Sequence, residues 1–317
     1  ENWQAKNGIL DSDKDGSISG TEQHPDRTES GLSPKLSLAH FFKNNISVRY
    51  SLGKAIRFPV VEELYKNVDT TLSKSIANIE LEPEQGIFQN LMFEKVIKQG
   101  FVRVNLFREQ MGDVIFNHSQ TIEGVSLSTF LPVEEVITNG IEFVLNKKNI
   151  MNLPLDIRFN LSYIDTEITK NAQNTDIVGK EFPRMPHWRS NLMTNYAILD
   201  SVDFANSLRY ASNSYGDLDN SDTASNIFGA QDNYVFFNTR LNWKMNKQMR
   251  VSIGVDNLFN DQAFVHHQYP SRSFFAEYMY EDVLLALMAA EGWDRESGKI
   301  IVNEEIYDPS SQQWIRD

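Results

Sequence analysis

LDIRFNLSY, residues 155–163, alternates apolar and polar side chains at every one of its positions. Successive side chains of a β-strand point to opposite faces, whereas a helix would distribute the same apolar residues around its axis. The stretch therefore predicts a strand with one apolar face, which carries Ile157, Phe159 and Leu161, and one polar face.

The same two-residue period recurs along most of the chain, for example at Val251, Ile253 and Val255. The connections between the predicted strands alternate between very short turns and long polar loops, which is typical of an antiparallel up-and-down sheet. Long loops are expected roughly at residues 54–82, 117–136, 166–185, 214–232 and 261–271. About eleven strands are predicted, beginning near residues 34, 45, 84, 100, 137, 154, 188, 202, 233, 247 and 272.

Strand length and aromatic residues distinguish two all-β architectures. The predicted strands are about 9 to 13 residues long, which suits a tilted crossing of a bilayer and exceeds the length of typical soluble strands. Aromatic residues gather near strand ends, as in the interfacial girdles of membrane barrels. These are Phe41, Phe42, Tyr163, Trp188, Tyr196, Tyr210, Tyr234, Phe274 and Phe275. We therefore predict an antiparallel up-and-down transmembrane β-barrel; the alternative is a soluble β-sandwich, whose apolar faces would pack between two sheets.

Composition argues against several classes of protein. The 317 residues include 30 Lys and Arg against 43 Asp and Glu, a net charge of −13, so a basic surface for nucleic acid is not expected. No apolar run is long enough for a transmembrane helix. The absence of Cys excludes disulfides and thiolate metal sites. The first residues show no signal-peptide pattern, so we expect either a processed chain or a piece of a longer one.

Six short motifs resemble, in order, segments of the barrel of TonB-dependent outer-membrane receptors. They are RYSLGKAIRFP with EELY (residues 49–65), LEPE (81–84), NGIE (139–142), FPRMP (182–186), GVDNLFN (254–260) and YPSRSFF (269–275). Each is weak alone, but their order and their spacing relative to the predicted hairpins match that family.

The resemblance covers roughly residues 25–281 and implies the C-terminal half of a barrel of about 22 strands in a Gram-negative type of outer membrane. The family's plug domain, TonB box and first barrel half have no counterpart here. Because open strand edges are strongly disfavoured in lipid, the missing strands are expected from the rest of a longer chain or from a partner. The expected organisation is an extracellular loop segment (1–33), the barrel half (34–281) and a C-terminal extension (282–317) with a short helix.

The resemblance also implies a function, which is TonB-energised uptake of a scarce ligand such as a ferric siderophore, cobalamin or another metal chelate. TonB would be contacted through the absent plug. An enzyme is not expected, and neither a nucleophile elbow nor a zinc-protease motif occurs. The alternative is a calcium-binding surface adhesin or another binding protein without transport activity. An outer-membrane hydrolase is a third and less favoured possibility.

Residues 11–22, DSDKDGSISGTE, fit the spacing of a twelve-residue calcium loop. Carboxylates fall at positions 1, 3 and 5, a glycine that permits the sharp turn falls at 6, and a glutamate that can bind with both oxygens falls at 12. The expected Ca²⁺ ligands are Asp11, Asp13, Asp15, Ser17, Ser19 and Glu22. Pro25 would end a following helix after one turn, so an isolated loop is favoured over a full EF-hand, and a flexible acidic loop is the alternative.

Three further segments are candidates for lesser roles. His266 and His267 are expected to be a surface pair, because adjacent side chains of an extended chain point apart; the alternative is a shared metal on a bent loop. The acidic stretch 217–232 is expected to be a solvated loop, and the alternative is a loop that binds cations. Residues 282–291 have high helix propensity, followed by a possible strand at 299–302, and form either a periplasmic docking element or sequence without a role in transport.

The calcium loop can be tested by titration. Asp11→Ala and Glu22→Ala each remove one expected ligand, so we expect each to weaken calcium binding measured by isothermal calorimetry. Ser12→Ala, at a position that supplies no ligand, is the matched control. Identical isotherms for all four proteins would reject the ligand assignment.

Overall fold

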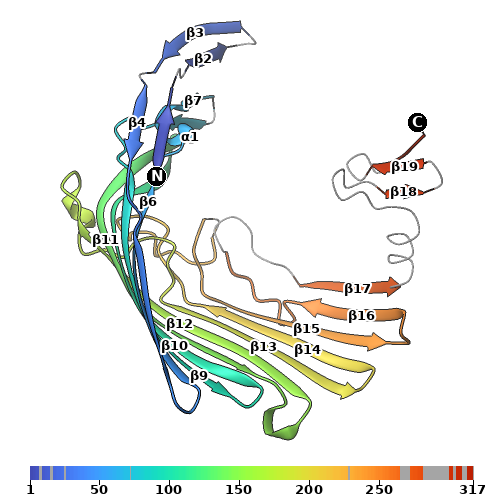
Figure 1. Cartoon of the computed structure of the whole chain (residues 1–317). Coiled ribbons are helices and arrows are strands. Elements are labelled where there is room, and N and C mark those ends of the chain that lie inside the picture. Colours follow the sequence, from blue (N-terminus) through green and yellow to red (C-terminus); the bar gives the residue numbers. More distant parts are fainter. Residues whose placement is uncertain are drawn as a thin grey trace.

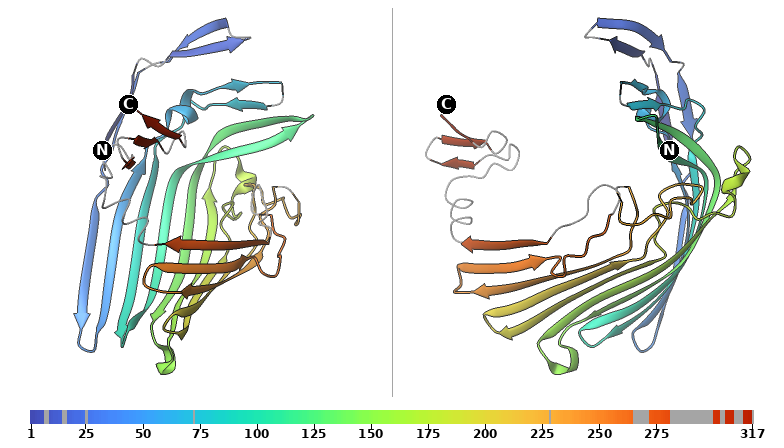
Figure 2. Two further views of the ribbon diagram at one scale, coloured as in Figure 1. Left: turned by 90° about the vertical axis from the view of Figure 1, so that its right-hand side faces the viewer. Right: turned by 180° about the vertical axis from the view of Figure 1, so that it is seen from behind.

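The computed structural model describes residues 1–6, 9–14, 17–24, 26–71, 73–227, 229–264, 272–280, 300–302, 305–308 and 313–316. Eleven strands follow one another in chain order and pair antiparallel into one strongly curved sheet (Figure 1). Figure 2 shows the same sheet from two further sides, where it curves like part of a cylinder wall. These strands are β5 (Lys35–Phe42), β6 (Ile46–Arg57), β9 (Glu84–Ile97), β10 (Gly100–Ile122), β11 (Val125–Lys147), β12 (Leu155–Lys170), β13 (Trp188–Leu199), β14 (Val202–Ala211), β15 (Tyr234–Lys244), β16 (Met249–Asp256) and β17 (Ser273–Tyr280).

This topology confirms the predicted fold class, a portion of an antiparallel up-and-down barrel. Every one of these strands except β11 begins within two residues of its predicted start. The edge strands β5 and β17 do not pair with each other, so the barrel is open in the part of the chain that the structure describes. Two short strands, β7 (Val68–Asp69) and β8 (Ser73–Ile76), complete the sheet, and β8 pairs in parallel with β11.

The remaining elements are short. They are β1 (Asn2–Ala5), β2 (Ile9–Lys14), β3 (Ser17–Gln23), β4 (Arg27–Ser30), α1 (Val61–Tyr65), the 3₁₀ turns η1 (Ile150–Asn152) and η2 (Thr175–Ile177), and the small sheet β18 (Ile300–Val302), β19 (Glu305–Asp308) and β20 (Gln313–Arg316). The segment expected as a loop at residues 1–33 thus contains two antiparallel ribbons, β1 with β4 and β2 with β3. The helix expected at 282–291 lies outside the described residues.

The register gives the sheet two chemically different faces. Phe159 of β12 lies directly beside Leu145 of β11 and Leu192 of β13, so apolar side chains form continuous rows on one face. Arg158 lies beside Asn146 on the other face. The nine-residue alternation therefore predicts correctly which side chains share a face.

No part of the chain that the structure describes covers the apolar face. Leu38, Ile253 and Phe274 are 61%, 51% and 74% exposed. A second sheet would bury such residues in a β-sandwich, so that alternative is wrong and the face suits contact with lipid. Tyr163 and Trp188 pair on it across two strands near the long-loop end, with ring centroids 4.8 Å apart.

Three of the expected girdle aromatics lie on the polar face instead. Phe41, Tyr234 and Phe275 pair with Ser47, Ala211 and Gly254 respectively, all of which are polar-face positions. The prediction was wrong for Phe41 and Phe275 because two aromatic residues in succession on a strand must point to opposite faces. It was wrong for Tyr234 because the adjacent Val235 takes the apolar face, where it pairs with Tyr210.

One predicted loop is a strand pair. The sequence predicted a loop over 117–136, but β10 and β11 continue to a tight turn at Glu123 and Gly124, whose φ angles are 51° and 83°. Strict alternation fails in this ribbon because it buries apolar side chains on both faces. Phe116 packs into one hydrophobic cluster and the adjacent Ile115 packs against another.

Arg57 joins the loop after β6 to the start of β9. Its guanidinium pairs with the carboxylate of Glu63 in α1, and its Nη1 lies 3.3 Å from Oε1 of Glu84. The Glu84 carboxylate also accepts a hydrogen bond of 2.7 Å from the backbone N–H of Ile115. Two of the motifs quoted above therefore meet at one guanidinium.

Glycines let aromatic rings lie flat against the polar face. A Cβ added at Gly140 would lie 2.2 Å from the Phe107 ring on β10, and one added at Gly254 would lie 2.3 Å from the Phe275 ring on β17. In both cases the ring covers the neighbouring glycine, and a side chain at that position would displace it. This pairing supplies packing where the strand itself has no side chain.

We expect Gly140→Ala to destabilise the sheet, because its methyl group must displace the Phe107 ring. Overpacking of this kind costs about 1–3 kcal/mol. The measurement is the temperature at which the compact band on a semi-native gel converts to the unfolded band. Gly112→Ala is the control, since a Cβ there would meet no atom closer than 3.7 Å. Equal midpoints for the two variants would contradict this account of Gly140.

Candidate functional site

The polar face of strands β5 to β17, here called the lumen wall, is the concave side of the sheet. Cavities lie along it, and polar-face residues make up most of their linings. Five arginines of these strands are on this face by register. They are Arg49, Arg103, Arg158, Arg240 and Arg250.

Hydrogen bonds between neighbouring strands hold part of the wall in place. Arg103 of β10 binds Glu94 of β9 at 2.5 Å, and Asn105 donates to the carboxylate of Glu142 at 3.2 Å. Arg49 makes no hydrogen bond or ion pair to the residues that the structure describes. The wall therefore combines cross-linked polar side chains with charged groups that remain available.

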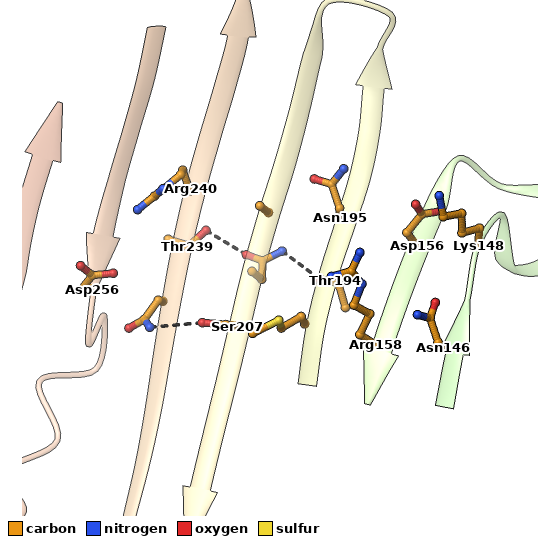
Figure 3. A pocket seen from close by; sticks show the side chains of 14 residues that line it. Asn146, Lys148, Asp156, Arg158, Thr194, Asn195, Ser207, Thr239, Arg240 and Asp256 are labelled. Carbon is orange, nitrogen blue, oxygen red and sulfur yellow. Dashed lines mark hydrogen bonds between the residues drawn. The ribbon is translucent and has the colours of Figure 1, made fainter. Parts of the chain in front are cut away.

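One cavity of the lumen wall has a volume of about 480 Å³ and spans strands β11 to β16 (Figure 3). Arg158 and Asp156 line it from β12, and Arg240 and Asp256 line it from the opposite side. Asn238 donates to Ser207 at 3.2 Å between them. The other lining residues are Asn146, Lys148, Met193, Thr194, Asn195, Ala205, Asn206 and Thr239. Cations, carboxylates and amides thus surround a polar space. This mixed lining selects for neither anions nor cations.

Arg240 is held by an aromatic ring. Its guanidinium carbon lies 4.3 Å from the centroid of the Phe275 ring, which covers Gly254. A cation above an aromatic face is stabilised by the ring quadrupole. The motif around Gly254 therefore has a physical role, because the missing side chain makes room for the ring that positions this guanidinium.

A second cavity, of about 290 Å³, contains two arginines that the sequence analysis did not single out. Arg189 and Arg209 line it from β13 and β14, together with Tyr234 from β15. Both arginines occupy polar-face positions of predicted strands, close to the long-loop end. The alternation itself could have identified them, whereas nothing in the sequence alone indicated that they share one cavity.

The long loops are fastened to one another above the wall. Asn220 accepts a hydrogen bond from the Glu181 backbone N–H at 2.8 Å and donates to the carbonyls of Glu181 and Asp217 at 3.0 and 3.2 Å. Arg184 donates its backbone N–H to the carbonyl of Tyr215 at 2.6 Å. One asparagine therefore links the loop after β14 to the loop after β12.

A hydrophobic cluster supports the same loops. Leu218 and Ile177 are buried against Phe116 and Ile168. The Arg184 guanidinium lies over the Phe116 ring, 5.5 Å from its centroid. The mouth of the lumen wall thus has a small core of its own, which gives the loops a defined arrangement.

Carboxylates of the acidic loop hold its own backbone. Asp222 accepts hydrogen bonds from the N–H groups of Gly216 and Asp217 at 2.5 and 3.3 Å, and Asp232 accepts one from the N–H of Asn226 at 3.0 Å. Burial and the nearby Asp222 carboxylate raise the pKa of Asp217 above its ordinary value. These contacts make the stretch a folded loop, whereas the sequence predicted only a solvated one.

His187 joins the end of this loop system to β12. Its Nδ1 lies 2.7 Å from the Ile164 carbonyl, and its Nε2 lies 3.2 Å from the Glu181 carboxylate. The hydrogen bond to Ile164 and the Glu181 charge raise the pKa of His187, although burial opposes them. A raised histidine pKa means that the stabilising contact is complete at low pH and is lost as the pH rises through that pKa.

The expected calcium ligands lie on or between two paired strands. Asp11 and Asp13 are on β2, and Ser17, Ser19 and Glu22 are on β3. Asp15 lies outside the described residues, as do His266 and His267. In the described part of the chain no three His, Asp or Glu side chains gather as metal ligands. The side chains of the calcium loop are not among those described, so the calcium assignment stays a prediction.

No helix in the described part of the chain is long and apolar enough to span a membrane.

Comparison with known protein families identifies the family of this chain. Residues 9–258 match the family described as TonB-dependent receptor-like, beta-barrel. The chain belongs to this family. Membership confirms the resemblance drawn from the six motifs and the outer membrane as the location. Receptors of this family are transporters and not enzymes, in agreement with the prediction from the sequence.

Solved structures show the same fold at low sequence identity. The ferric enterobactin receptor PfeA from Pseudomonas aeruginosa, as a mutant bound to enterobactin, aligns with a TM-score of 0.58 at 14% identity, over 80% of this chain and 40% of that one. The siderophore receptor PiuA from Acinetobacter baumannii gives 0.56 at 16% identity, over 85% and 36%. The copper transporter OprC gives 0.64 at 14% identity, over 86% and 44%.

The chain spans about 40% of the length of these receptors. Among curated proteins, no sequence matches it significantly.

We expect Asn220→Ala to release the loop after β14 from the loop after β12, since three hydrogen bonds to Asn220 are lost. A buried backbone group left without its partner costs about 1–3 kcal/mol. Hydrogen exchange measured by mass spectrometry should become faster in residues 178–184 and 214–222. Asn213→Ala removes an exposed amide of the same loop and should leave the exchange unchanged. If both variants exchange like the wild type, Asn220 does not link the two loops.

Proposed function

We propose that this chain forms part of an outer-membrane receptor that takes up a scarce metal chelate, with energy delivered through TonB. The observation that carries the proposal is a polar, cavity-bearing lumen wall on the concave side of a sheet whose other side suits lipid. This arrangement belongs to a chain of the TonB-dependent receptor family. A wall of this kind can bind a polar solute inside a barrel that crosses the bilayer.

The relatives in structure support a metal or metal chelate as the cargo. According to their names, one is a ferric enterobactin receptor, one is a siderophore receptor and one is a copper transporter. At about 15% identity they share a fold with this chain, so they support the class of cargo and leave the individual ligand open.

The proposed route begins at the loops and ends at the plug. The fastened loops above the wall would form the first contact with the chelate, and the lumen wall would hold it next. The plug, which in this family contacts TonB, is not part of this sequence. We therefore propose that the plug acts together with this wall, and that the energy for release comes from the inner membrane.

Deletion of the gene tests the proposal in the organism that makes the chain. The deletion strain should grow normally in rich medium and poorly when iron or copper is withheld by a chelator. An intact copy of the gene should restore growth. Uptake of the radiolabelled metal should stop in wild-type cells when an uncoupler removes the proton gradient.

The opposite outcome is also informative. A deletion strain that takes up every tested metal chelate like the wild type, but loses attachment to a surface, would favour a binding protein without transport.

A further inference from the structure

We propose that His187 is a pH-sensitive latch at the mouth of the lumen wall. In its doubly protonated form the ring fastens the loop after β12, and loss of one proton to water releases this fastening. The proposal goes beyond transport, because it concerns how the loops are held and applies whatever the cargo is.

The first step is the number of protons that the ring needs. Its Nδ1 lies 2.7 Å from the carbonyl oxygen of Ile164, and its Nε2 lies 3.2 Å from Oε1 of Glu181. Carbonyl and carboxylate oxygens accept hydrogen bonds, so both ring nitrogens must donate. A neutral imidazole has one N–H, whereas the imidazolium has two. The two contacts therefore exist together only while the ring is charged.

The second step is which contact the neutral ring gives up. The shorter distance is the one to Ile164, so the remaining proton stays on Nδ1. The lone pair of Nε2 then faces Oε1 of Glu181, and two acceptors repel each other. The carbonyl of His187 accepts from the N–H of Ile164 at 2.8 Å in either state, which keeps His187 on β12. Loss of the proton therefore frees Glu181 and leaves the ring in place.

The third step is the electrostatic surroundings of the ring. Two carboxylates face it, Glu181 from the loop and Asp165 from β12. The hydrogen bond to Ile164 raises the pKa of His187 above its ordinary value of about 6.5, the two carboxylates raise it further, and burial opposes them. The side chains of His187 and Glu181 are 32% and 34% exposed, so both can exchange protons with water. The latch is therefore closed at low pH and opens as the pH rises through this pKa.

The fourth step is the connection from Glu181 to a second loop. Its N–H donates to Oδ1 of Asn220 at 2.8 Å, and its carbonyl accepts from Nδ2 of Asn220 at 3.0 Å. Asn220 also donates to the carbonyl of Asp217 at 3.2 Å. The residue that the ring holds by its carboxylate thus holds the loop after β14 by its main chain, so the change reaches both loops.

Other contacts of the same stretch involve groups that do not titrate. The N–H of Gly179 donates to the carbonyl of Ile168 at 2.8 Å, and the N–H of Phe182 donates to Oγ1 of Thr166 at 3.2 Å. They keep the loop beside β12 when the ring is neutral. We therefore expect opening of the latch to increase the motion of residues 181–187 without unfolding the sheet.

A second group of titratable side chains lies in the same loop system. The carboxyl group of Asp217 faces Asp222, Asp219 and Arg184, and it also faces His118 of β10. A change of charge at Asp217 or at His118 would act on the loop after β14 as well. Each of these two residues therefore needs a variant of its own in the test.

The test is hydrogen exchange of the complete receptor in outer membranes between pH 5 and pH 9, measured by mass spectrometry. Amide rates divided by the intrinsic rates at each pH give the protection of the backbone, and exchange of the ring C2 hydrogen gives the pKa of each histidine. Protection of residues 181–187 and 214–222 should fall about tenfold as the pH rises, because a charge-assisted hydrogen bond is lost. The midpoint should coincide with the pKa of His187.

Two variants change the latch in opposite ways. In Glu181→Gln the amide can accept from Nε2–H or donate to a bare Nε2, so protection should stay high at every pH and the pKa of His187 should fall. His187→Phe keeps a ring beside Tyr163, on which His187 stacks with centroids 5.8 Å apart, but it has no donor. Its protection should be low at every pH.

His118→Gln and Asp217→Asn are the controls, and both should keep the midpoint of the wild type. If His187→Phe does not reach the outer membrane, the comparison of the wild type with Glu181→Gln decides alone. Constant protection of the wild type from pH 5 to pH 9 would overturn the latch. So would a transition that persists in Glu181→Gln, or one that disappears in His118→Gln. None of these measurements uses uptake, so the latch and the proposed function can fail separately.

Discussion

Backbone hydrogen bonding is the constraint on which this structure depends. A strand that crosses a bilayer finds no water for its N–H and C=O groups, so each strand must pair with a neighbour along its full length. Pairing in chain order satisfies this need with the shortest turns, and it produces the sequential order of strands from β5 to β17. The two-residue period of the side chains then follows, because a paired strand has only two faces.

The two faces meet different demands, and both affect the site. The outer face needs only apolar rows, which Phe159 and its neighbours supply. The lumen wall must stay polar and still pack, and it does so with cross-strand hydrogen bonds and with rings that lie against glycines. The Phe275 ring that covers Gly254 also positions Arg240. Packing of the wall and presentation of its charges are therefore carried by the same residues.

The local pattern of alternating side chains and turn residues predicts the sheet well and the site poorly, and the reason is physical. Strand order and most strand starts follow from alternation and turn residues, which are local. The extension of β10 and β11 was missed because Ile115 and Phe116 are buried on opposite sides of a ribbon, so that apolar residues there do not alternate with polar ones. Arg189 and Arg209 stand on predicted strands, but their shared cavity and their lack of partners depend on side-chain contacts across three strands. Those contacts have no signature in a single stretch of sequence.

The assignment of the two faces is the central claim, and single spin labels test it most directly. The chain has no Cys, so one cysteine at a time can be introduced and labelled. In membranes that contain the receptor, labels at positions 159, 161 and 208 should be quenched mainly by oxygen dissolved in lipid. Labels at positions 158, 160 and 209 should be quenched mainly by a water-soluble nickel chelate. Equal quenching at odd and even positions of β12 would contradict the two-faced wall from which the rest of this account follows.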